Sequence, residues 1–368
     1  MKLSSAVSLI DEDLRKRILS ETTADSIFKR VKRAILKYSL RKPDWINSVD
    51  RKFCWINAQY AMGILSSGTK EDIRVLTHYY DSLLILKYLG YPVFEVPDQV
   101  PHAEVMLKLY FDYGKKRYIP LINEAATMLA HIAEINEGFV IYWPPDPALL
   151  LDSLGMISNF CYLYDEVFHT DILSKVAQKL LDTMEHNCVD PDTGFLYHSY
   201  NYVDGKTEGV STWGRGIGWY LLGLTSYVQK FGLKADRLVD ILGRIYAGQD
   251  EAGFLYDDVK LKRHVDSSPT CMAAYCMALC IDNNIIEEEE LSRFYASFSK
   301  SVLALLSCVN KNGEVLNCSG ECAKAGEYSR DFGNYFSQGY TLMLFQLILR
   351  SKKLQLVLEQ TQKGRLVL

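Results

Sequence analysis

The sequence predicts an all-α fold in which six helical hairpins close into a ring, an (α/α)6 toroid, with short β segments in the loops between hairpins. Three observations predict it. Apolar residues recur at helical spacing along most of the chain, a glycine-led segment repeats about every sixty residues, and no Ser/Gly/Pro-rich linker divides the chain. With 368 residues, 48% of them hydrophobic, the chain is long enough to bury one large core.

The helices are predicted from apolar periodicity, broken at clusters of Gly, Pro and Asp. This periodicity gives about twelve helices, at 24–39, 53–66, 70–89, 101–113, 117–133, 147–166, 170–187, 213–232, 235–247, 267–281, 288–308 and 332–350. We expect one domain over 1–368, with an extra N-terminal helical segment at about 1–20 and a short C-terminal tail at about 351–368.

The repeat supplies the order of the hairpins. Each copy places a glycine before a short β-prone run: NEGFVIYW (136–143), TGFLYHSY (193–200), EAGFLYDD (251–258) and KNGEVLNC (311–318), with Gly90 extending the series backwards. Each copy continues with a polar loop and two helices. Such a period is typical of helical hairpins stacked in an open superhelix or closed in a ring. The long loops favour the ring.

Composition separates inner from outer helices. The segments 213–232 and 267–281 are rich in apolar and small residues and carry few charges, as expected for helices buried all round. The segment 170–187 has one charged face, which is typical of an outer helix.

The overall charge argues against a nucleic-acid partner. The formal charge at pH 7 is -4 and the pI is about 6.0, so no basic field covers the chain. Basic residues within 15–41 are interleaved with Ile, Leu and Phe at helical spacing, which is typical of a solvated helix face. No apolar run is long enough to span a bilayer. We therefore expect neither nucleic acid nor membrane as a partner.

The nine cysteines indicate a reducing compartment. Most lie in apolar helical context, and the first residues lack the apolar core and cleavage site of a signal peptide. We therefore expect a cytoplasmic protein. The pair Cys318 and Cys322 could form half of a metal site, but no second Cys or His pair accompanies it at ligand spacing. Since a P-loop and a dinucleotide fingerprint are also missing, we expect no metal and no cofactor.

The chemistry is expected at one end of the ring. Each loop delivers a polar residue to the start of the next inner helix: Asp98, Asp152, Arg215, Asp266 and Asp331. The N-termini of inner helices gather at one end of such a ring, so these side chains would converge on one funnel. Any single Asp has a simpler explanation as a helix N-cap.

Asp152 is the strongest catalytic candidate. Leucines flank it one turn into an apolar helix, and a desolvated carboxyl there keeps its proton and can give and take it near neutral pH. The alternative is a buried structural Asp. Asp98 would be a second carboxylate that helps to hold the proton, and paired carboxyls are common in enzymes that cleave sugars.

The stretch GVSTWGRGIGWYLLGL (209–224) suggests the ligand. Trp213 and Trp219 offer flat apolar faces, and Arg215 offers a planar fork that suits a carboxylate. Together they favour a small, flat, anionic ligand such as a uronic sugar. His198 would hydrogen-bond to the sugar, unless it is structural, and Trp143 would form a stacking wall.

Four motifs in order resemble one enzyme family: LLDSLGM (150–156), TGFLYHSY (193–200), WGRGIGW (213–219) and a helix start in which Asp266 is followed by SSPTCMAAY (267–275). From about residue 50 to 350 the chain resembles the unsaturated glucuronyl and unsaturated rhamnogalacturonyl hydrolases of glycoside hydrolase families 88 and 105, the six-hairpin glycosidases. Ile217 departs from the family, which usually has Asn or Gln there.

The resemblance implies the roles of the residues. Asp152 would be the catalytic acid/base and Asp98 its carboxylate partner. The remaining candidates would bind substrate: Trp143, His198, Trp213, Arg215, Trp219 and Asp266. The implied substrate is an oligosaccharide that ends in a 4,5-unsaturated uronic acid, and the implied reaction is hydration of its enol ether, without metal or cofactor.

Three alternatives remain at this point. An inverting hydrolase of a saturated glycoside would use Asp98 and Asp152 as acid and base. A sugar epimerase would need two bases across the ring, usually histidines. The histidines near loop ends are His102, His198 and His264. A non-catalytic sugar-binding relative is the third alternative, made credible by Ile217, because one fold hosts many functions.

Overall fold

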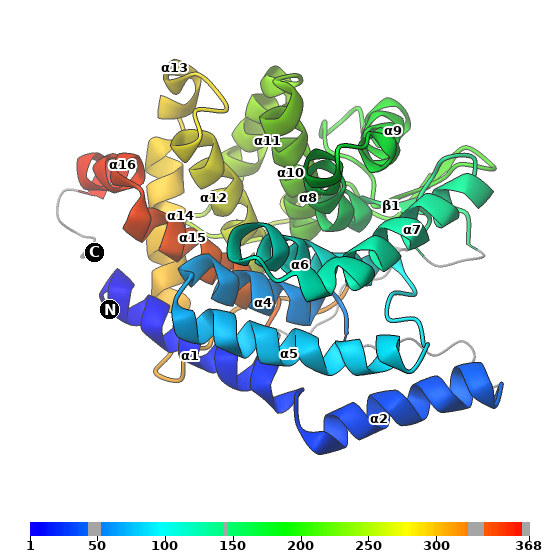
Figure 1. The fold of residues 1–368 in the computed structure, drawn as a ribbon. Helices are drawn as coiled ribbons and strands as arrows, with labels where there is room; N and C mark the ends of the chain where they lie inside the picture. The colour runs from blue at the N-terminus through cyan, green and yellow to red at the C-terminus, as the bar shows by residue number, and fades with distance from the viewer. Residues whose placement is uncertain (43–52, 143–145, 323–334, 363–368) are drawn as a thin grey trace.

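The computed structural model describes residues 1–42, 53–142, 146–322 and 335–362. Its core is a closed ring of six inner helices, in which each helix packs against the next and the last packs against the first. In Figure 1 these helices lie in the middle of the molecule. They are α4 (Trp55–Ser67), α6 (Val100–Tyr113), α8 (Leu151–Phe168), α10 (Gly214–Phe231), α12 (Ser267–Asp282) and α15 (Gln338–Arg350).

A second set of helices surrounds the ring. Each outer helix follows its inner partner along the chain and returns antiparallel to it, which gives six hairpins. The outer helices are α5 (Lys70–Tyr88), α7 (Ile119–Ile135), α9 (Ile172–Asn187), α11 (Ala235–Ala247), α14 (Tyr295–Cys308) and α16 (Lys352–Gln362). The short α13 (Glu288–Ser292) precedes α14. The predicted (α/α)6 toroid is confirmed.

Burial follows the predicted division between inner and outer helices. Nearly every residue of α12 is buried, whereas α9 buries one stripe: Leu173, Ala177, Leu180, Leu181 and Met184. The inner helices approach one another closely where glycines allow it. A Cβ on Gly155 of α8 would lie 2.6 Å from Trp219 Cε3, and one on Gly223 of α10 would lie 2.7 Å from the Leu154 carbonyl oxygen. These glycines let α8 and α10 pack backbone against side chain.

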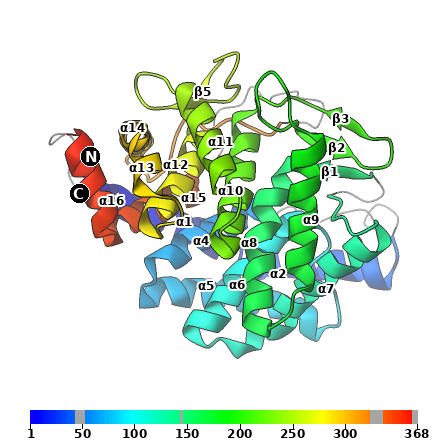
Figure 2. The ribbon, with the colours of Figure 1, turned by 90° about the horizontal axis from the view of Figure 1, so that it is seen from above.

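Short strands occur in the loops between hairpins, as predicted. Strands β1 (Ala148–Leu150), β2 (Ser199–Asn201) and β3 (Lys206–Glu208) form an antiparallel sheet, and β4 (Leu255–Tyr256) pairs with β5 (Val265–Asp266). Figure 2 shows β1, β2, β3 and β5 at the same end of the ring. The repeat glycines share one conformation, with φ from 73° to 104°: Gly90, Gly138, Gly194, Gly253 and Gly313.

Both ends of the chain need correction against the sequence prediction. Helix α1 (Leu3–Ser20) packs on α4, α5 and α15, and α2 (Ala24–Ala34) lies outside the ring, followed by the short π-helix η1 (Ile35–Ser39). The predicted helix at 24–39 is therefore not one of the twelve helices of the hairpins. The predicted tail at 351–368 instead contains α16, which packs on α12, α14 and α15.

Three predicted helices also have different boundaries. The segment 147–166 begins with strand β1, and its helix, α8, starts at Leu151. The segment 288–308 is divided into α13 and α14, and 332–350 begins as a helix at Gln338, after residues that lie outside the described part. Within the described residues, no helix is both long enough and apolar enough to cross a membrane.

Candidate active site

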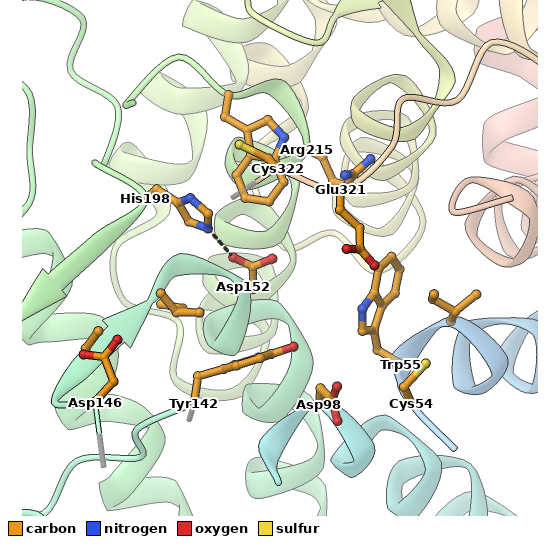
Figure 3. A pocket seen from close by; sticks show the side chains of 14 residues that line it. Cys54, Trp55, Asp98, Tyr142, Asp146, Asp152, His198, Arg215, Glu321 and Cys322 are labelled. Carbon is orange, nitrogen blue, oxygen red and sulfur yellow. Dashed lines mark hydrogen bonds and ion pairs between the residues drawn. The ribbon is translucent and has the colours of Figure 1, made fainter. Parts of the chain in front are cut away.

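A cavity of about 550 Å³ opens where the N-terminal ends of the inner helices gather. Its walls come from the start of α4, the segment before α6, the segment that enters α8, the loop before α10, the first turn of α10 and the loop before α15 (Figure 3). The lining residues are Cys54, Trp55, Ile56, Asp98, Tyr142, Asp146, Ala148, Leu150, Asp152, His198, Trp213, Arg215, Glu321 and Cys322.

Asp152 and His198 form a hydrogen-bonded pair in this cavity. Asp152 is the second residue of α8, and its Oδ2 lies 3.0 Å from His198 Nε2 (Figure 3). The pairing of β1 with β2 fixes this geometry, because Leu150 opposes Ser199 and the Leu151 amide donates to the His198 carbonyl at 2.9 Å. The chain thus sets the histidine opposite the first turn of the helix that carries the carboxylate.

The surroundings of His198 define its tautomer. Its ring is buried against Trp213, with ring centroids 4.6 Å apart. Its Nδ1 is buried without a hydrogen-bond partner in the described structure. An unpaired buried N–H costs more than an unpaired lone pair. We therefore assign the proton to Nε2, which donates it to Asp152 Oδ2.

Asp98 has a more enclosed environment. It lies in the 3-10 turn η2 (Pro97–Gln99) ahead of α6, and it is 8% exposed, compared with 16% for the side chain of Asp152. Its Oδ1 is buried without a partner among the described residues. Burial raises the pKa of Asp98 from 3.8 to about 7. Burial thus favours the protonated form of Asp98 near neutral pH.

Tyr142 is a cavity residue that was not predicted from the sequence. Figure 3 shows its ring extending between Asp98 and Asp152. Burial and these two carboxylates raise the pKa of the phenol well above its ordinary value, so the hydroxyl keeps its proton. Tyr142 directly precedes Trp143, which was expected to form a stacking wall and lies outside the described residues.

Arg215 lines the cavity, but its guanidinium also holds a loop. Nη1 donates to Ser268 Oγ at 3.2 Å and to the carbonyl and hydroxyl oxygens of Ser319 at 3.0 Å each, and Nη2 donates to the Gly320 carbonyl. The loop continues into Glu321 and Cys322 on the cavity wall. Arg215 is thus an anchor for one wall as well as a candidate for contact with an anion.

Asp266 does not line the cavity. It is buried at the N-cap of α12, where Oδ1 accepts from the Ser268 amide at 2.8 Å and from the Ser319 amide at 3.2 Å. This is the N-cap role that the sequence left open as the alternative. Asp266 therefore binds the same loop that Arg215 holds, without lining the cavity itself.

Trp219 also lies behind the wall instead of in it. It is buried in α10, and its ring meets Trp55 edge to face, with centroids 5.2 Å apart. Trp55, at the start of α4, is the indole that faces the cavity together with Trp213. The signal that could have identified Trp55 is its place at the N-terminal end of a predicted inner helix. The quoted repeat begins only at Gly90, which follows this helix.

Two further residues lie away from the cavity. Ile217 is buried inside α10, so the departure from the family pattern falls in the core. His102 is buried, stacks on Phe53 with centroids 4.1 Å apart and bonds to Tyr80 through Nδ1. Burial lowers the pKa of His102 well below its ordinary value. In the described part of the chain, His198 is the one histidine that lines the cavity.

The cavity is rich in carboxyl groups. Among the described residues, Asp98, Asp146, Asp152 and Glu321 line it, together with one guanidinium, that of Arg215. The described residues contain no group of three or more His, Cys, Asp or Glu side chains arranged to hold a metal ion. The arrangement suits proton transfer: burial favours the protonated form of one carboxyl, Asp98, near neutral pH, and a second, Asp152, is held by a hydrogen bond to a histidine.

Comparisons with known proteins agree with the fold. The family Glycosyl Hydrolase Family 88 matches residues 94–351. A possible member of the GH105 family from Klebsiella pneumoniae is similar in structure, with a TM-score of 0.68 and 14% identity, over 81% of this chain and 82% of that one. The unsaturated glucuronyl hydrolase of Bacillus sp. GL1, responsible for degradation of glycosaminoglycan, gives 0.65 and 16%, over 82% and 87%.

An unsaturated glucuronyl hydrolase specific for heparin gives a TM-score of 0.62 and 16% identity, over 94% of this chain and 99% of that one. No curated protein matches the sequence.

Proposed function

Since the chain belongs to glycosyl hydrolase family 88 and is a glycosidase, we propose that it removes a 4,5-unsaturated uronic acid from the non-reducing end of an oligosaccharide by hydrating the enol ether of that sugar. Two unsaturated glucuronyl hydrolases of the same fold support this substrate class. The observation that carries the proposal is the pair of carboxyls, Asp98 and Asp152, in one cavity beside His198.

The proposed reaction needs one proton and one water. A carboxylic acid protonates C4 of the ring, and positive charge develops at C5 beside the ring oxygen. Water adds at C5 and returns a proton to the carboxylate, so the enzyme is restored. The hemiketal then opens, C5 becomes a ketone, and C1 releases the linked sugar as it becomes an aldehyde. The net change is the addition of water.

We assign the proton transfers at the sugar to Asp152, the more accessible of the two carboxyls. Asp98 is the partner that holds the proton between turnovers, because burial raises its pKa to about 7, and it passes this proton to Asp152 before C4 is protonated. The pair then carries one proton at neutral pH, which is the number that the first step consumes. His198 keeps Asp152 oriented through its hydrogen bond, and the Tyr142 ring extends between the two carboxyls.

Binding of the uronate uses the two sides of the cavity differently. Trp55 and Trp213 offer aromatic faces to the sugar ring. Its carboxylate would lie toward the guanidinium of Arg215 and away from the lining carboxyls, Asp98, Asp146, Asp152 and Glu321. A charge-assisted hydrogen bond of this kind contributes about 1.5–3 kcal/mol. The proton on Asp98 also removes one negative charge that would repel the substrate.

The test is to offer an unsaturated uronyl disaccharide and to follow the ultraviolet absorbance of its enol ether. The wild type should remove the absorbance, and Asp152→Asn should abolish this without loss of folding, measured by circular dichroism. Cleavage of a saturated glycoside with the enol ether left intact would favour the inverting hydrolase. Binding of sugar acids without turnover of either substrate would favour a non-catalytic relative.

We also propose that the enzyme works in the cytoplasm. Eight of the nine cysteine side chains are buried, as is common for thiols in proteins of reducing compartments. Cell fractionation with an antibody against the protein tests this, and recovery outside the cytoplasmic fraction would contradict it.

A further inference from the structure

The segment that carries Asp98 is held in place by side chains on three sides. Residues 90–99 lead from α5 to α6 without a long helix of their own. The Glu124 carboxylate of α7 accepts from the amides of Val93 at 2.5 Å and Phe94 at 3.1 Å. Gln99 Oε1 accepts from the amides of Glu95 at 2.7 Å and Val96 at 3.2 Å. The backbone on both sides of Asp98 is therefore closely fixed.

The third attachment is ionic and comes from the N-terminal arm. The Glu95 carboxylate accepts from Arg33 Nη1 at 3.1 Å, from Lys37 Nζ and from the Tyr38 hydroxyl. The side chain of Glu95 is 8% exposed, and those of Arg33 and Lys37 are nearly as enclosed. Arg33 lies in α2, while Lys37 and Tyr38 lie in η1. All three precede the region that matches the family, 94–351.

The same segment also supports the adjoining wall of the cavity, where Figure 3 shows Cys54 and Trp55 beside Asp98. Phe94 packs edge to face on Phe53, with ring centroids 5.5 Å apart, and Phe53 directly precedes Cys54 and Trp55. A displacement of Glu95 would therefore be transmitted to Asp98 along three residues of backbone. A displacement of Phe94 would be transmitted to Trp55 through the ring contact with Phe53.

We propose that Glu95 is a positioning residue for Asp98, and that the arm formed by α2 and η1 is part of the support of the active site. The proposal rests on the function proposed above, since it gives Asp98 a role in the reaction. Removing the carboxylate would break the enclosed ion pairs that Glu95 makes with Arg33 and Lys37, which is costly and would loosen the arm from the loop. Displacements of about 1 Å can cost about a hundredfold in rate.

The decisive comparison is between two buried ion pairs on the same helix. Glu95→Ala removes the anion that the loop presents to Arg33 of α2 and to Lys37 of η1. Glu21→Ala is the matched control, because Glu21 pairs with Arg30 of α2 at 3.5 Å and is similarly enclosed, but it ties α2 to the end of α1. Both changes should lower the melting temperature. Only Glu95→Ala should lower kcat, by about tenfold or more, with kcat falling more than KM rises.

The pH profile supplies a readout that a purely structural role would not move. If Glu95 keeps the loop closed over Asp98, Glu95→Ala admits water and the limb of kcat/KM that Asp98 causes moves to lower pH. Glu95→Gln, which keeps the shape, should move it less, and Tyr38→Phe, which removes one donor and no charge, should move it least. The other titratable groups that line this cavity are Cys54, Tyr142, Asp146, Asp152, His198, Arg215, Glu321 and Cys322.

A double-mutant cycle separates this inference from the proposed function. In an Asp98→Asn background, Glu95→Ala should cause a much smaller further loss of kcat, since only the part of its effect that reaches Trp55 remains. If Asp98→Asn is as active as the wild type, the proposed role of Asp98 is wrong. If Asp98→Asn is slow while Glu95→Ala and Glu95→Gln keep wild-type kcat and pH profile, this inference alone is wrong. Should Glu95→Ala fail to fold, the Gln and Tyr38→Phe variants decide in the same way.

Discussion

At the scale of residues, two aspartates in one cavity differ because of what surrounds them. Asp152 is reached by a histidine N–H and by solvent, which suits an ionised group. Asp98 is enclosed by a 3-10 turn and by Tyr142, and burial raises its pKa to about 7. Environments that move the pKa values of two carboxyls apart give the two groups different protonation states at one pH.

This difference predicts the pH dependence of the free enzyme. Since the pKa of Asp98 is raised, its protonated form dominates below about pH 7 and is lost as the pH rises through that value. We expect kcat/KM to fall above about pH 7, approaching about tenfold for each further pH unit. Asp98→Asn should be slower than the wild type at neutral pH and should lack this limb. Initial rates of absorbance loss at low substrate concentration measure it, and a wild-type profile that is flat from neutral to alkaline pH would contradict the assignment.

The sequence identified those cavity residues that stand in the repeated pattern. Asp98, Asp152, His198, Trp213 and Arg215 all precede or begin an inner helix, and the cavity contains all five. The other lining side chains, Trp55, Tyr142 and Glu321 among them, lie in loops or in copies of the repeat where the pattern is weak. The acceptors of Arg215 could not be foreseen either, because Ser319 and Gly320 lie more than a hundred residues further along the chain.

At the scale of elements, the contact between α8 and α10 determines where two site residues, Asp152 and Arg215, lie relative to each other. Asp152 and Arg215 are each the second residue of their helix. Gly155 faces Trp219 and Gly223 faces Leu154 across the same contact. Glycines in a helix look like a weakness in the sequence, because they lower helix propensity. The reason for them appears only when the neighbouring helix is known.

Gly155→Ala should therefore lower both stability and activity. Its Cβ would lie 2.6 Å from Trp219 Cε3 and 2.7 Å from the Trp219 carbonyl oxygen, so α8 has to shift against α10. We expect a loss of about 1–3 kcal/mol in the free energy of unfolding, measured by urea denaturation, and a lower kcat because Asp152 moves with the helix.

The matched control is Gly243→Ala in the outer helix α11. There the nearest atom is Phe294 Cζ at 3.4 Å, which is ordinary contact, so the gain in helix propensity of up to about 1 kcal/mol should prevail. If Gly155→Ala is as stable as Gly243→Ala, the close approach of α8 and α10 is not what the glycine is for.

Element boundaries were harder to predict than element types. The helices with a long apolar pattern were found within a few residues, but the segment 288–308 breaks near Arg293 between α13 and α14. The last helix was missed because it is short and amphipathic, with only three residues that are buried in a stretch of eleven: Leu354, Val357 and Leu358. A pattern of this length is also typical of a polar tail, and only packing distinguishes the two.

At the scale of the whole molecule, the ring is stable because it closes. Helix α15 packs on α4, so the end of the chain completes what the first hairpin began, and α1 lies across both. Helix α16 covers the outside of this closure by packing on α12, α14 and α15. The cavity depends on the closure, since its walls come from α4 at one end of the chain and from the loop before α15 at the other. A defect in the last hairpin should therefore be felt across the molecule.

Leu354→Ala in α16 tests this directly. Leu354 is fully buried, so we expect a loss of about 2–5 kcal/mol in the free energy of unfolding. The exposed Leu356 of the same helix, 44% accessible, is the matched control, and Leu356→Ala should change stability by about 0.5 kcal/mol or less. Tryptophan fluorescence reports on α4 and α10, because Trp55 and Trp219 pack against each other there.

If the ring unfolds as one unit, Leu354→Ala shifts the fluorescence transition and the far-ultraviolet helix signal to the same lower urea concentration. If α16 is a separate unit, part of the helix signal is lost early while the tryptophan transition stays where it is in the wild type. The second outcome would mean that α16 only covers the ring. The site at the N-terminal ends of α4 and α10 would then not depend on α16.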